Sequence, residues 1–212
     1  MKAVVFDLDG TLVDTLRDLA EATNRALEVN GFPACPLEAY TQMVGNGARK
    51  LIERGLGTAG TPERTERVLA DFLRIYDRDC LTYTRPYAGM EETVDALRDR
   101  GLRLLVVTNK PEAQARKIVT RFFPGRFAAV YGGTAGRPAK PDPAATLSAL
   151  ESADAAPEEA LFVGDSNVDI YTARAAGMRS AGAVWGFRGE EELRAAGADS
   201  LLLRPGDLLG LL

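Results

Sequence analysis

The sequence contains no histidine among its 212 residues. This absence excludes Ser-His-Asp triads, phosphohistidine intermediates and histidine-based zinc or iron sites together. Only two cysteines are present, Cys35 and Cys80, and their wide separation indicates reduced thiols rather than a disulfide framework. A cysteine phosphatase is unsupported as well, because Cys80 is followed by Arg85 with no glycine-rich loop between them. Any chemistry must therefore use carboxylates, hydroxyls, amides or lysine.

Long apolar runs and basic stretches are also missing. No run reaches membrane-spanning length, and no stripe of lysine and arginine accompanies the net charge of -4. We therefore expect no membrane or nucleic-acid partner, whereas a small phosphorylated metabolite fits a few local positive groups. The chain reaches Asp7 after four apolar residues, too few for a secretion signal, so we expect a cytoplasmic protein. The oligomeric state is left open.

The hydrophobic pattern changes along the chain. Residues 3–8 form an apolar, branched run typical of a strand buried on both faces. Residues 15–81 have helical periodicity throughout, with helices expected over 14–30, 36–44, 48–54 and from Thr61 to about Tyr76. After a proline-containing connector, helices and strands alternate. The expected helices are 90–100, 111–123, 143–151, 168–176 and 190–196, and the expected strands are 102–107, 127–131, 160–163, 180–185 and a short one near Leu201.

This alternation predicts an α/β fold with a doubly wound, Rossmann-like parallel sheet. The all-helical block follows the first strand and precedes all the others. We therefore expect a catalytic core made of residues 1–14 and 82–212, with residues 15–81 inserted as a helical cap. The cap is expected to form a lid over the active site.

Ligands bind beyond the carboxyl ends of the strands in such sheets, and the residues at those positions are polar here. The residues that follow strands or lie in the adjoining loops are Asp7, Asp9, Gly10, Thr11, Thr108, Asn109, Lys110, Lys140, Gly164, Asp165, Ser166 and Asp169.

Asp7 and Asp9 are two residues apart, so in extended backbone their side chains point the same way. Two carboxylates about 4 Å apart repel by roughly 4 kcal/mol at an effective dielectric constant of 20, and Asp165 adds to the crowding. A bound cation would relieve this repulsion, and oxygen ligands favour Mg²⁺. One carboxylate can then attack phosphorus while the other acts as general acid and base.

The polar segments occur in a recognisable order. They are Asp7-Leu-Asp9-Gly10-Thr11-Leu12, Val107-Thr108-Asn109-Lys110, Lys140-Pro141 and Gly164-Asp165-Ser166-Asn167-Val168-Asp169. Together they resemble the four motifs of the haloacid dehalogenase superfamily. The helical block is similar to the small α-helical cap of that superfamily.

The resemblance implies a role for each motif residue. Asp7 would be the nucleophile and Asp9 the general acid/base. Thr108, Asn109, Lys140 and Gly10 would bind the substrate phosphate. The implied Mg²⁺ site comprises Asp7, the backbone carbonyl of Asp9, Asp165 and the supporting Asp169.

Two segments resemble the phosphoglycolate phosphatase subgroup, namely 44–51 and 107–111. Gly45, Asn46 and Gly47 precede a helix, so its free amides could meet a substrate carboxylate, with Arg49 as a possible partner. The resemblance therefore favours 2-phosphoglycolate as substrate. One departure is Asp142-Pro143 after Lys140-Pro141, where subgroup members often carry histidine.

Several residues also have simpler interpretations. Thr108 and Asn109 could cap the helix that begins near Pro111, and Asp165 or Asp169 could cap the next one. Arg49 could face solvent. The GxGxxG match at 55–60 follows a helix rather than a strand, which indicates a loop instead of a nucleotide site.

The sequence also bears on activities other than hydrolysis of a phosphomonoester. A phosphomutase of the superfamily is disfavoured because its cap uses a histidine, and a dehalogenase would not need Asp9. Hydrolysis of pyrophosphate, a nucleoside monophosphate or a sugar phosphate stays open. A protein that binds phosphometabolites without turnover is the alternative that is not an enzyme.

Overall fold

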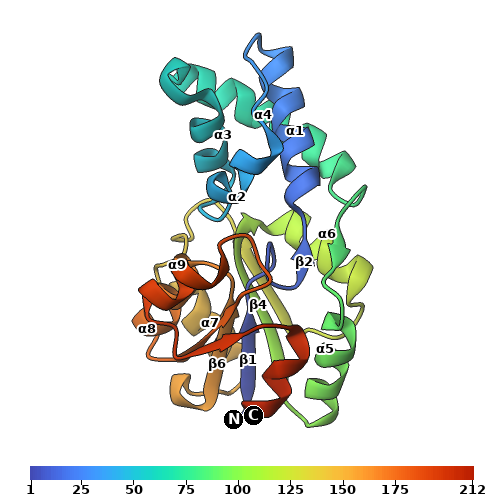
Figure 1. The fold of residues 1–212 in the computed structure, drawn as a ribbon, viewed down its shortest axis with the longest axis vertical. Helices are drawn as coiled ribbons and strands as arrows, with labels where there is room; N and C mark the ends of the chain where they lie inside the picture. Colours follow the sequence, from blue (N-terminus) through green and yellow to red (C-terminus); the bar gives the residue numbers. More distant parts are fainter.

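A six-stranded parallel sheet forms the centre of the protein (Figure 1). The computed structural model describes all 212 residues. The strand order is β5-β4-β1-β6-β7-β8, with every neighbouring pair parallel. The strands are β1 (Ala3–Phe6), β4 (Arg103–Pro111), β5 (Ala129–Gly133), β6 (Ala160–Gly164), β7 (Arg179–Ala183) and β8 (Ser200–Leu202). The predicted α/β class with a doubly wound parallel sheet is therefore confirmed.

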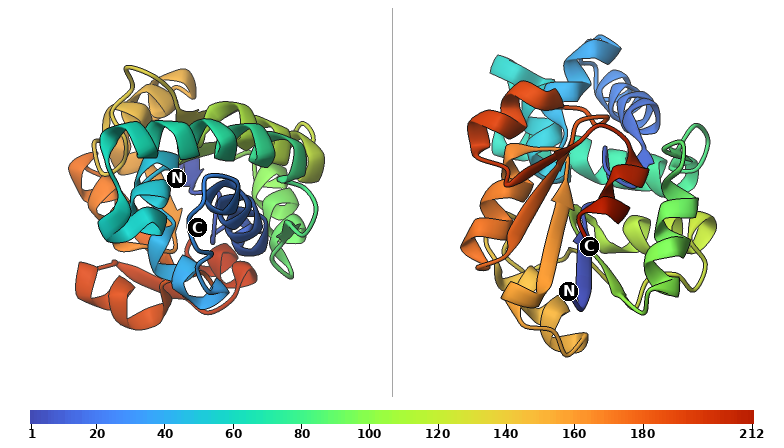
Figure 2. Two further views of the ribbon diagram at one scale, coloured as in Figure 1. Left: turned by 90° about the horizontal axis from the view of Figure 1, so that it is seen from above. Right: turned by 60° about the horizontal axis from the view of Figure 1, so that its bottom comes forward.

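Successive residues of the central strands pack on opposite faces of the sheet. Val4 and Phe6 belong to one hydrophobic cluster, whereas Ala3 and Val5 belong to another. This follows from the two-residue period of a strand, and both faces are buried because helices cover each of them (Figure 2). Helices α5 (Met90–Asp99) and α6 (Glu112–Phe122) pack on the first cluster, α7 (Ala144–Ser152) and α8 (Asn167–Ala175) on the second, and α9 (Gly189–Ala196) beside β7.

We call residues 15–81 the helical insertion. It leaves the α/β part of the protein after β2 (Val13–Asp14) and returns to it at β3 (Arg85–Pro86). These two short strands pair antiparallel. The insertion contains α1 (Leu16–Val29), α2 (Tyr40–Met43), α3 (Ala48–Leu56) and α4 (Pro62–Asp79). Its helices enclose a hydrophobic cluster of their own, made of 16 buried residues. They stand beyond one end of the sheet, and both chain termini lie at the opposite end (Figure 1).

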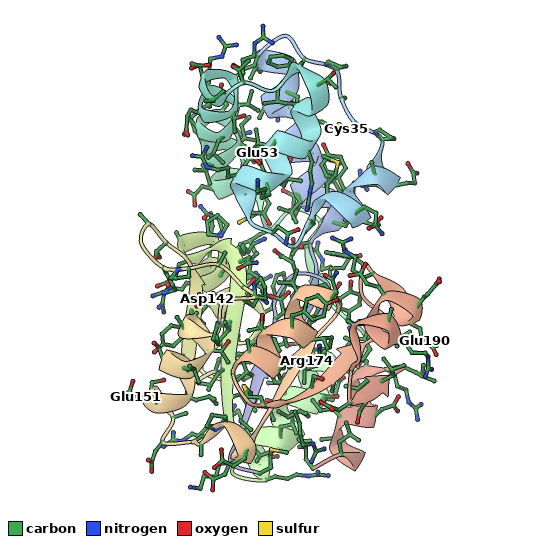
Figure 3. All side chains as sticks on the ribbon, turned by 90° about the vertical axis from the view of Figure 1, so that its left-hand side faces the viewer. Cys35, Glu53, Asp142, Glu151, Arg174 and Glu190 are labelled. Carbon is green, nitrogen blue, oxygen red and sulfur yellow. The ribbon has the colours of Figure 1, made fainter.

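Side chains fill the junction between the insertion and the sheet. In Figure 3, Glu53 lies in the upper helical part, whereas Asp142 lies in the α/β part close to the junction. The returning connector is fixed to α1 by Asp18, a buried carboxylate that accepts hydrogen bonds from the backbone amides of Tyr83 and Thr84, each at 2.9 Å. The base of the insertion is therefore anchored at a defined point.

Two expected elements differ in extent. The helix expected over 36–44 is a 3₁₀ turn at Leu37–Ala39 followed by the four-residue α2, because Val44 is extended and Gly45 has a φ of 111°. The strand expected to end at Val107 continues as β4 to Pro111, which pairs with Gly133 after an irregularity in register. Further 3₁₀ turns are Gly57–Ala59, Pro157–Glu159 and Pro205–Gly210. None of the helices combines the length and apolar composition needed to cross a membrane.

Candidate active site

Asp7, Lys140 and Asp169 form a buried ionic cluster at the carboxyl end of the sheet. Asp7 directly follows β1, and the loop between β5 and α7 brings the Lys140 Nζ to 2.9 Å from Asp7 Oδ1. The same Nζ donates a hydrogen bond to Asp169 Oδ1 at 2.6 Å. All three side chains are buried. An ammonium at this depth requires such partners, since an unpaired buried charge is very unfavourable.

Asp169 is held from its other side by the start of α8. Its Oδ2 accepts hydrogen bonds from the Ser166 backbone amide at 3.1 Å and from the Ser166 hydroxyl at 2.7 Å. Ser166 and Asp169 thus form the capping box of α8. Gly164 allows this arrangement, because a Cβ atom there would lie 2.2 Å from the Cβ of Asp169. The capping interpretation is therefore confirmed for Asp169, which also contacts Lys140.

Asp165 occupies a tight pocket between two glycines. A Cβ atom on Gly10 would lie 2.3 Å from Asp165 Oδ2, and one on Gly186 would lie 2.2 Å from the Asp165 Cβ. The carboxylate accepts hydrogen bonds from the Phe187 amide at 2.8 Å and from the Thr11 hydroxyl at 3.3 Å. Gly10 thus gives the Asp165 carboxylate room beside the first motif.

The carboxylates outnumber the positive charge that faces them. Burial raises the pKa of Asp7 to about 6; Lys140 opposes this rise, whereas Asp169 and Asp9 add to it. Burial together with Asp169 and Asp7 also raises the pKa of Asp165. Burial disfavours the charge on Lys140, but Asp169 and Asp7 outweigh this effect and raise its pKa. The cluster therefore holds its negative charge at an electrostatic cost.

This carboxylate cluster has the composition of a site for a hard cation. One oxygen each from Asp7, Asp165 and Asp169 lies within 4.8 Å of the others. Asp7 Oδ1 is buried and receives no directed hydrogen bond, since its contact with Lys140 is an ion pair of poor hydrogen-bond geometry. An oxygen-only donor set with one unsatisfied oxygen fits a divalent cation such as Mg²⁺ or Ca²⁺.

Asp9 lies apart from that cluster although it is only two residues from Asp7. Its carboxylate accepts hydrogen bonds from the Thr15 hydroxyl at 2.7 Å and from Lys110 Nζ at 2.8 and 3.1 Å. The backbone turns just afterwards at Gly10, where φ is 81°. Asp7 and Asp9 still line one cavity, so the structure brings together the two predicted catalytic carboxylates. Because these hydrogen bonds occupy the Asp9 carboxylate, the proposed metal ligand from Asp9 is its backbone carbonyl oxygen.

Thr108 and Asn109 differ in what they offer to a ligand. Thr108 is buried and lines the cavity. Asn109 donates from Nδ2 to the carbonyl oxygens of Gly45 at 3.0 Å and Lys140 at 3.1 Å, and its Oδ1 accepts from the Lys140 amide at 2.8 Å. The Asn109 side chain is thus occupied in joining β4, the Lys140 loop and the helical insertion. Neither residue caps α6, which has no side-chain cap, so that alternative is wrong.

The helical insertion supplies the opposite wall of the cavity with apolar side chains and backbone. Leu19, Val44, Leu51 and Phe72 line this side together with the segment at the start of α3. The cavity is narrow, since the centre of a water molecule can reach only about 30 Å³ of it.

The predicted contacts from the insertion are only partly at the cavity. Gly45 and Gly47 line it, whereas the Asn46 side chain accepts a hydrogen bond from Arg54 at 2.6 Å. The structure does not bring Arg49 there, because its exposed side chain pairs with Glu66 at 2.5 Å. The solvent-facing interpretation of Arg49 therefore describes this structure.

Sequence reasoning assigned no role to Lys110, Tyr76 or Arg188. Lys110 and Tyr76 line the cavity, and Arg188 donates hydrogen bonds to the carbonyl oxygens of Val44 at 2.8 Å and Gln42 at 3.2 Å. The sequence could have indicated Lys110, since a lysine two residues after Thr108 in the same strand lies on the same face of the sheet as Thr108. No sequence pattern could have indicated Arg188, because its partners are backbone atoms 144 and 146 residues away.

The family model described as haloacid dehalogenase-like hydrolase matches residues 4–183, which include all four carboxylates and Lys140. The chain belongs to this family. The match therefore spans both the sheet and the helical insertion of this haloacid dehalogenase-like hydrolase.

Individual relatives agree with the family assignment. The chain is 40% identical over 194 residues to phosphoglycolate phosphatase 1 of Pseudomonas aeruginosa, covering 88% of this chain and 70% of that protein. It is 35% identical over 213 residues to the phosphoglycolate phosphatase of Aquifex aeolicus, covering 100% and 97%. A crystal structure of a protein from Lactobacillus delbrueckii subsp. bulgaricus superimposes with a TM-score of 0.93 at 30% identity, covering 98% and 96% of the two chains.

Proposed function

We propose that this haloacid dehalogenase-like hydrolase is a Mg²⁺-dependent phosphatase that forms an aspartyl phosphate on Asp7, with 2-phosphoglycolate as its substrate. The observation that carries the proposal is the buried Asp7 Oδ1, which receives no hydrogen bond of good geometry although Lys140 Nζ lies 2.9 Å away. A carboxylate oxygen without a directed hydrogen bond keeps lone pairs available for attack. The names of the relatives in Pseudomonas aeruginosa and Aquifex aeolicus support the choice of substrate.

The first chemical step transfers the phosphoryl group to the protein. A carboxylate oxygen of Asp7 forms a bond to phosphorus while the bond from phosphorus to the ester oxygen breaks. Asp9, in its protonated form, gives its proton to the departing oxygen. Thr108 donates a hydrogen bond to a phosphoryl oxygen, and Lys140 balances negative charge on Asp7 and the phosphoryl group.

The second step regenerates Asp7. The ionised Asp9 carboxylate removes a proton from water, and the resulting oxygen nucleophile attacks phosphorus. The bond between phosphorus and Asp7 then breaks, and inorganic phosphate leaves. Asp9 thus ends the cycle protonated, as it began.

Asp7, Asp165 and the Asp9 carbonyl would hold Mg²⁺, with Asp169 orienting Lys140 and the loop that carries Asp165. Bound Mg²⁺ supplies the positive charge that lets a carboxylate approach an anionic phosphoryl group. Burial raises the pKa of Asp7 and of Asp165, and neighbouring carboxylates raise each pKa further, so a cation that neutralises these side chains should bind there.

The helical insertion would act as the cap that encloses the substrate. The first backbone amides of a helix have no acceptor within it, and α3 begins at the cavity. We assign the amides that follow Gly47 to the carboxylate of 2-phosphoglycolate, with Gly45, Asn46 and Gly47 shaping the loop. Arg49 would contribute only after a rearrangement that breaks its pair with Glu66.

A phosphate-release assay tests the substrate. We expect Mg²⁺-dependent release from 2-phosphoglycolate exceeding that from pyrophosphate, nucleoside monophosphates and sugar phosphates, and loss of release on addition of EDTA. Binding of these compounds without phosphate release would instead indicate a protein that binds metabolites without turnover.

Isotope labelling tests the nucleophile independently of the substrate. Turnover in ¹⁸O-labelled water should place heavy oxygen in the released inorganic phosphate and none in the Asp7 carboxylate, because water attacks phosphorus and the bond between phosphorus and Asp7 breaks. Rapid quenching with acid during turnover, followed by peptide mapping, then locates the phosphoryl group on the protein. Phosphate on the peptide containing Asp7, and its absence from Asp7→Asn, is the expected result.

A further inference from the structure

Lys110 is a buried cation for which the proposed mechanism has no use. It is 4% exposed and lies near the end of β4, on the same face of the strand as Thr108. Its Nζ contacts the carboxylate of Asp9 at 2.8 and 3.1 Å. The same Nζ donates a hydrogen bond to the Tyr76 hydroxyl at 2.5 Å. The ammonium therefore joins the proposed acid/base on the sheet side to α4 of the helical insertion.

Tyr76 is rigidly held at its end of this contact. It is fully buried, and its ring stacks on Phe72 with centroids 5.3 Å apart and planes 11° from parallel. The Lys110 Nζ also lies 4.6 Å from the centre of the Tyr76 ring. Burial raises the pKa of Tyr76 well above its usual value, so the phenol stays neutral and accepts the hydrogen bond. Tyr76 thus holds the Lys110 ammonium next to α4 of the helical insertion.

Both contacts that fix the Asp9 carboxylate depend on the helical insertion. Thr15, which donates to Asp9 at 2.7 Å, is the residue immediately before α1. Lys110, which donates from the other side, is held by Tyr76 on α4. Entry of a substrate would move α4 away from the sheet, and α4 would return when the insertion closes over the substrate. The return of α4 would restore the Tyr76 contact and with it the position of Lys110.

We infer that Lys110 is a positioning residue for the acid/base Asp9, and that Tyr76 acts through Lys110 to align Asp9 when the helical insertion closes. This inference rests on the proposed role of Asp9. A lysine that merely neutralised a buried carboxylate would affect folding and all substrates alike. A positioning lysine affects the step in which Asp9 donates its proton.

Phenyl phosphate and 4-nitrophenyl phosphate, two aryl phosphates of similar shape and equal charge, distinguish a lysine that positions Asp9 from one that only neutralises its charge. Phenolate is a poor leaving group and needs the proton, whereas 4-nitrophenolate leaves readily without it. The ratio kcat/KM covers events up to formation of the phosphorylated protein, so it excludes the later use of Asp9 as a base. Lys110→Met, of similar length, should lower kcat/KM for phenyl phosphate about tenfold more than for 4-nitrophenyl phosphate.

Tyr76→Phe tests the connection to α4. It removes the hydroxyl and keeps the ring on Phe72, so we expect the same selective loss, roughly threefold to tenfold. In the Lys110→Met background, Tyr76→Phe should add no further selective loss, because Tyr76 would act only through the ammonium. Tyr40→Phe is the matched control: Tyr40 is also fully buried in the insertion, but its hydroxyl donates to Asn24 at 2.7 Å. It should not change the ratio between the two substrates.

Equal losses on both aryl phosphates in Lys110→Met and Tyr76→Phe would overturn the inference, as would additive selective effects in the double variant. If Lys110→Met does not fold, the comparison of Tyr76→Phe with Tyr40→Phe tests the inference, because only Tyr76→Phe should change the ratio between the two substrates. Failure of the proposed function has a different signature: the parent would release phosphate from neither 2-phosphoglycolate nor the two aryl esters, or Asp9→Asn would hydrolyse these compounds as the parent does. Selective loss in Asp9→Asn without any in Lys110→Met and Tyr76→Phe refutes this inference alone.

Discussion

The sheet edge and the helical insertion face each other across one cavity, but they present different groups to it. The sheet edge offers charged side chains, of which Asp7 and Lys110 are buried and Asp9 is partly buried. The insertion offers Leu19, Val44 and other apolar side chains, together with the backbone around Gly47. Its charged side chains, such as Arg49, pair at the surface instead. The difference indicates that the sheet performs the chemistry, whereas the insertion selects by shape, backbone dipoles and closure.

Removing the proposed nucleophile should have the largest effect. Asp7→Asn is expected to lower phosphate release from 2-phosphoglycolate by roughly 10⁴-fold or more, because no other group is placed to accept the phosphoryl group. The fold should survive: burial already disfavours the charge on Asp7, so the variant should be at least as stable as the parent in EDTA. Phosphate release would measure the first outcome and thermal unfolding the second. Activity near that of the parent would place the chemistry elsewhere.

The acid/base on the same edge comes next. Asp9→Asn should reduce kcat by about 10² to 10⁴, the usual contribution of general acid–base catalysis. The amide keeps the size of the side chain, so thermal unfolding should confirm an intact fold. A variant as fast as the parent would show that another group moves the proton.

A change on the insertion should act on closure rather than chemistry. Gly47 has a φ of 86°, and a Cβ atom there would lie 3.4 Å from the Asn109 carbonyl oxygen on the sheet side. Gly47→Ala should raise KM for 2-phosphoglycolate by about tenfold, equivalent to roughly 1.4 kcal/mol. Gly57→Ala is the control, since Gly57 also has a positive φ, of 51°, but meets nothing within 4 Å. An equal rise in KM for both variants would attribute the effect to backbone strain alone.

Charge pairing on the sheet side extends beyond the cavity, and pH can reveal it. Burial opposes the ionised form of Glu112, but hydrogen bonds from Arg137 and Arg116 outweigh it and lower its pKa to about 2. A lowered pKa stabilises the fold above the unfolded value of about 4.3, and this contribution is lost as pH falls towards 2. Glu112→Gln should therefore reduce the free energy of unfolding by about 1 to 2 kcal/mol at pH 7.

Urea denaturation at pH 7 and pH 3 measures this contribution. The difference between the parent and Glu112→Gln should shrink at pH 3, because there the unfolded parent binds a proton at Glu112 whereas the folded parent, with a pKa of about 2, keeps this carboxylate mostly ionised. Glu191→Gln, at an exposed position, should differ little from the parent at either pH. A difference for Glu112→Gln that stays constant between the two pH values would contradict the assignment.

Arg49 should give the smallest effect and is the most direct challenge to the comparison between the two sides. Its pair with Glu66 is exposed, and such pairs contribute about 0.2 to 1 kcal/mol to stability. Arg49→Ala should therefore change KM for 2-phosphoglycolate by less than about twofold in steady-state assays. A rise of tenfold or more would mean that the insertion rearranges to bring Arg49 to the substrate.

The sheet and the order of its motifs could be predicted without a structure. Buried strands leave an apolar signature in the chain, and parallel strands place their carboxyl ends at one edge, so Asp7, Thr108 and Asp165 had to meet there. The sequence also allowed a capping role for Asp165 or Asp169, because both lie near the start of a predicted helix, and the structure shows this role for Asp169. These are local regularities, and they can be read without coordinates.

The way in which the cavity is closed could not be predicted from the sequence. Asn109 is occupied by Gly45 and Lys140, which lie 64 and 31 residues away, and Lys110 meets Tyr76 across 34 residues. Such contacts depend on how the helical insertion is docked on the sheet. No periodicity or spacing specifies that docking, because it results from the packing of side chains and backbone that are distant in the chain.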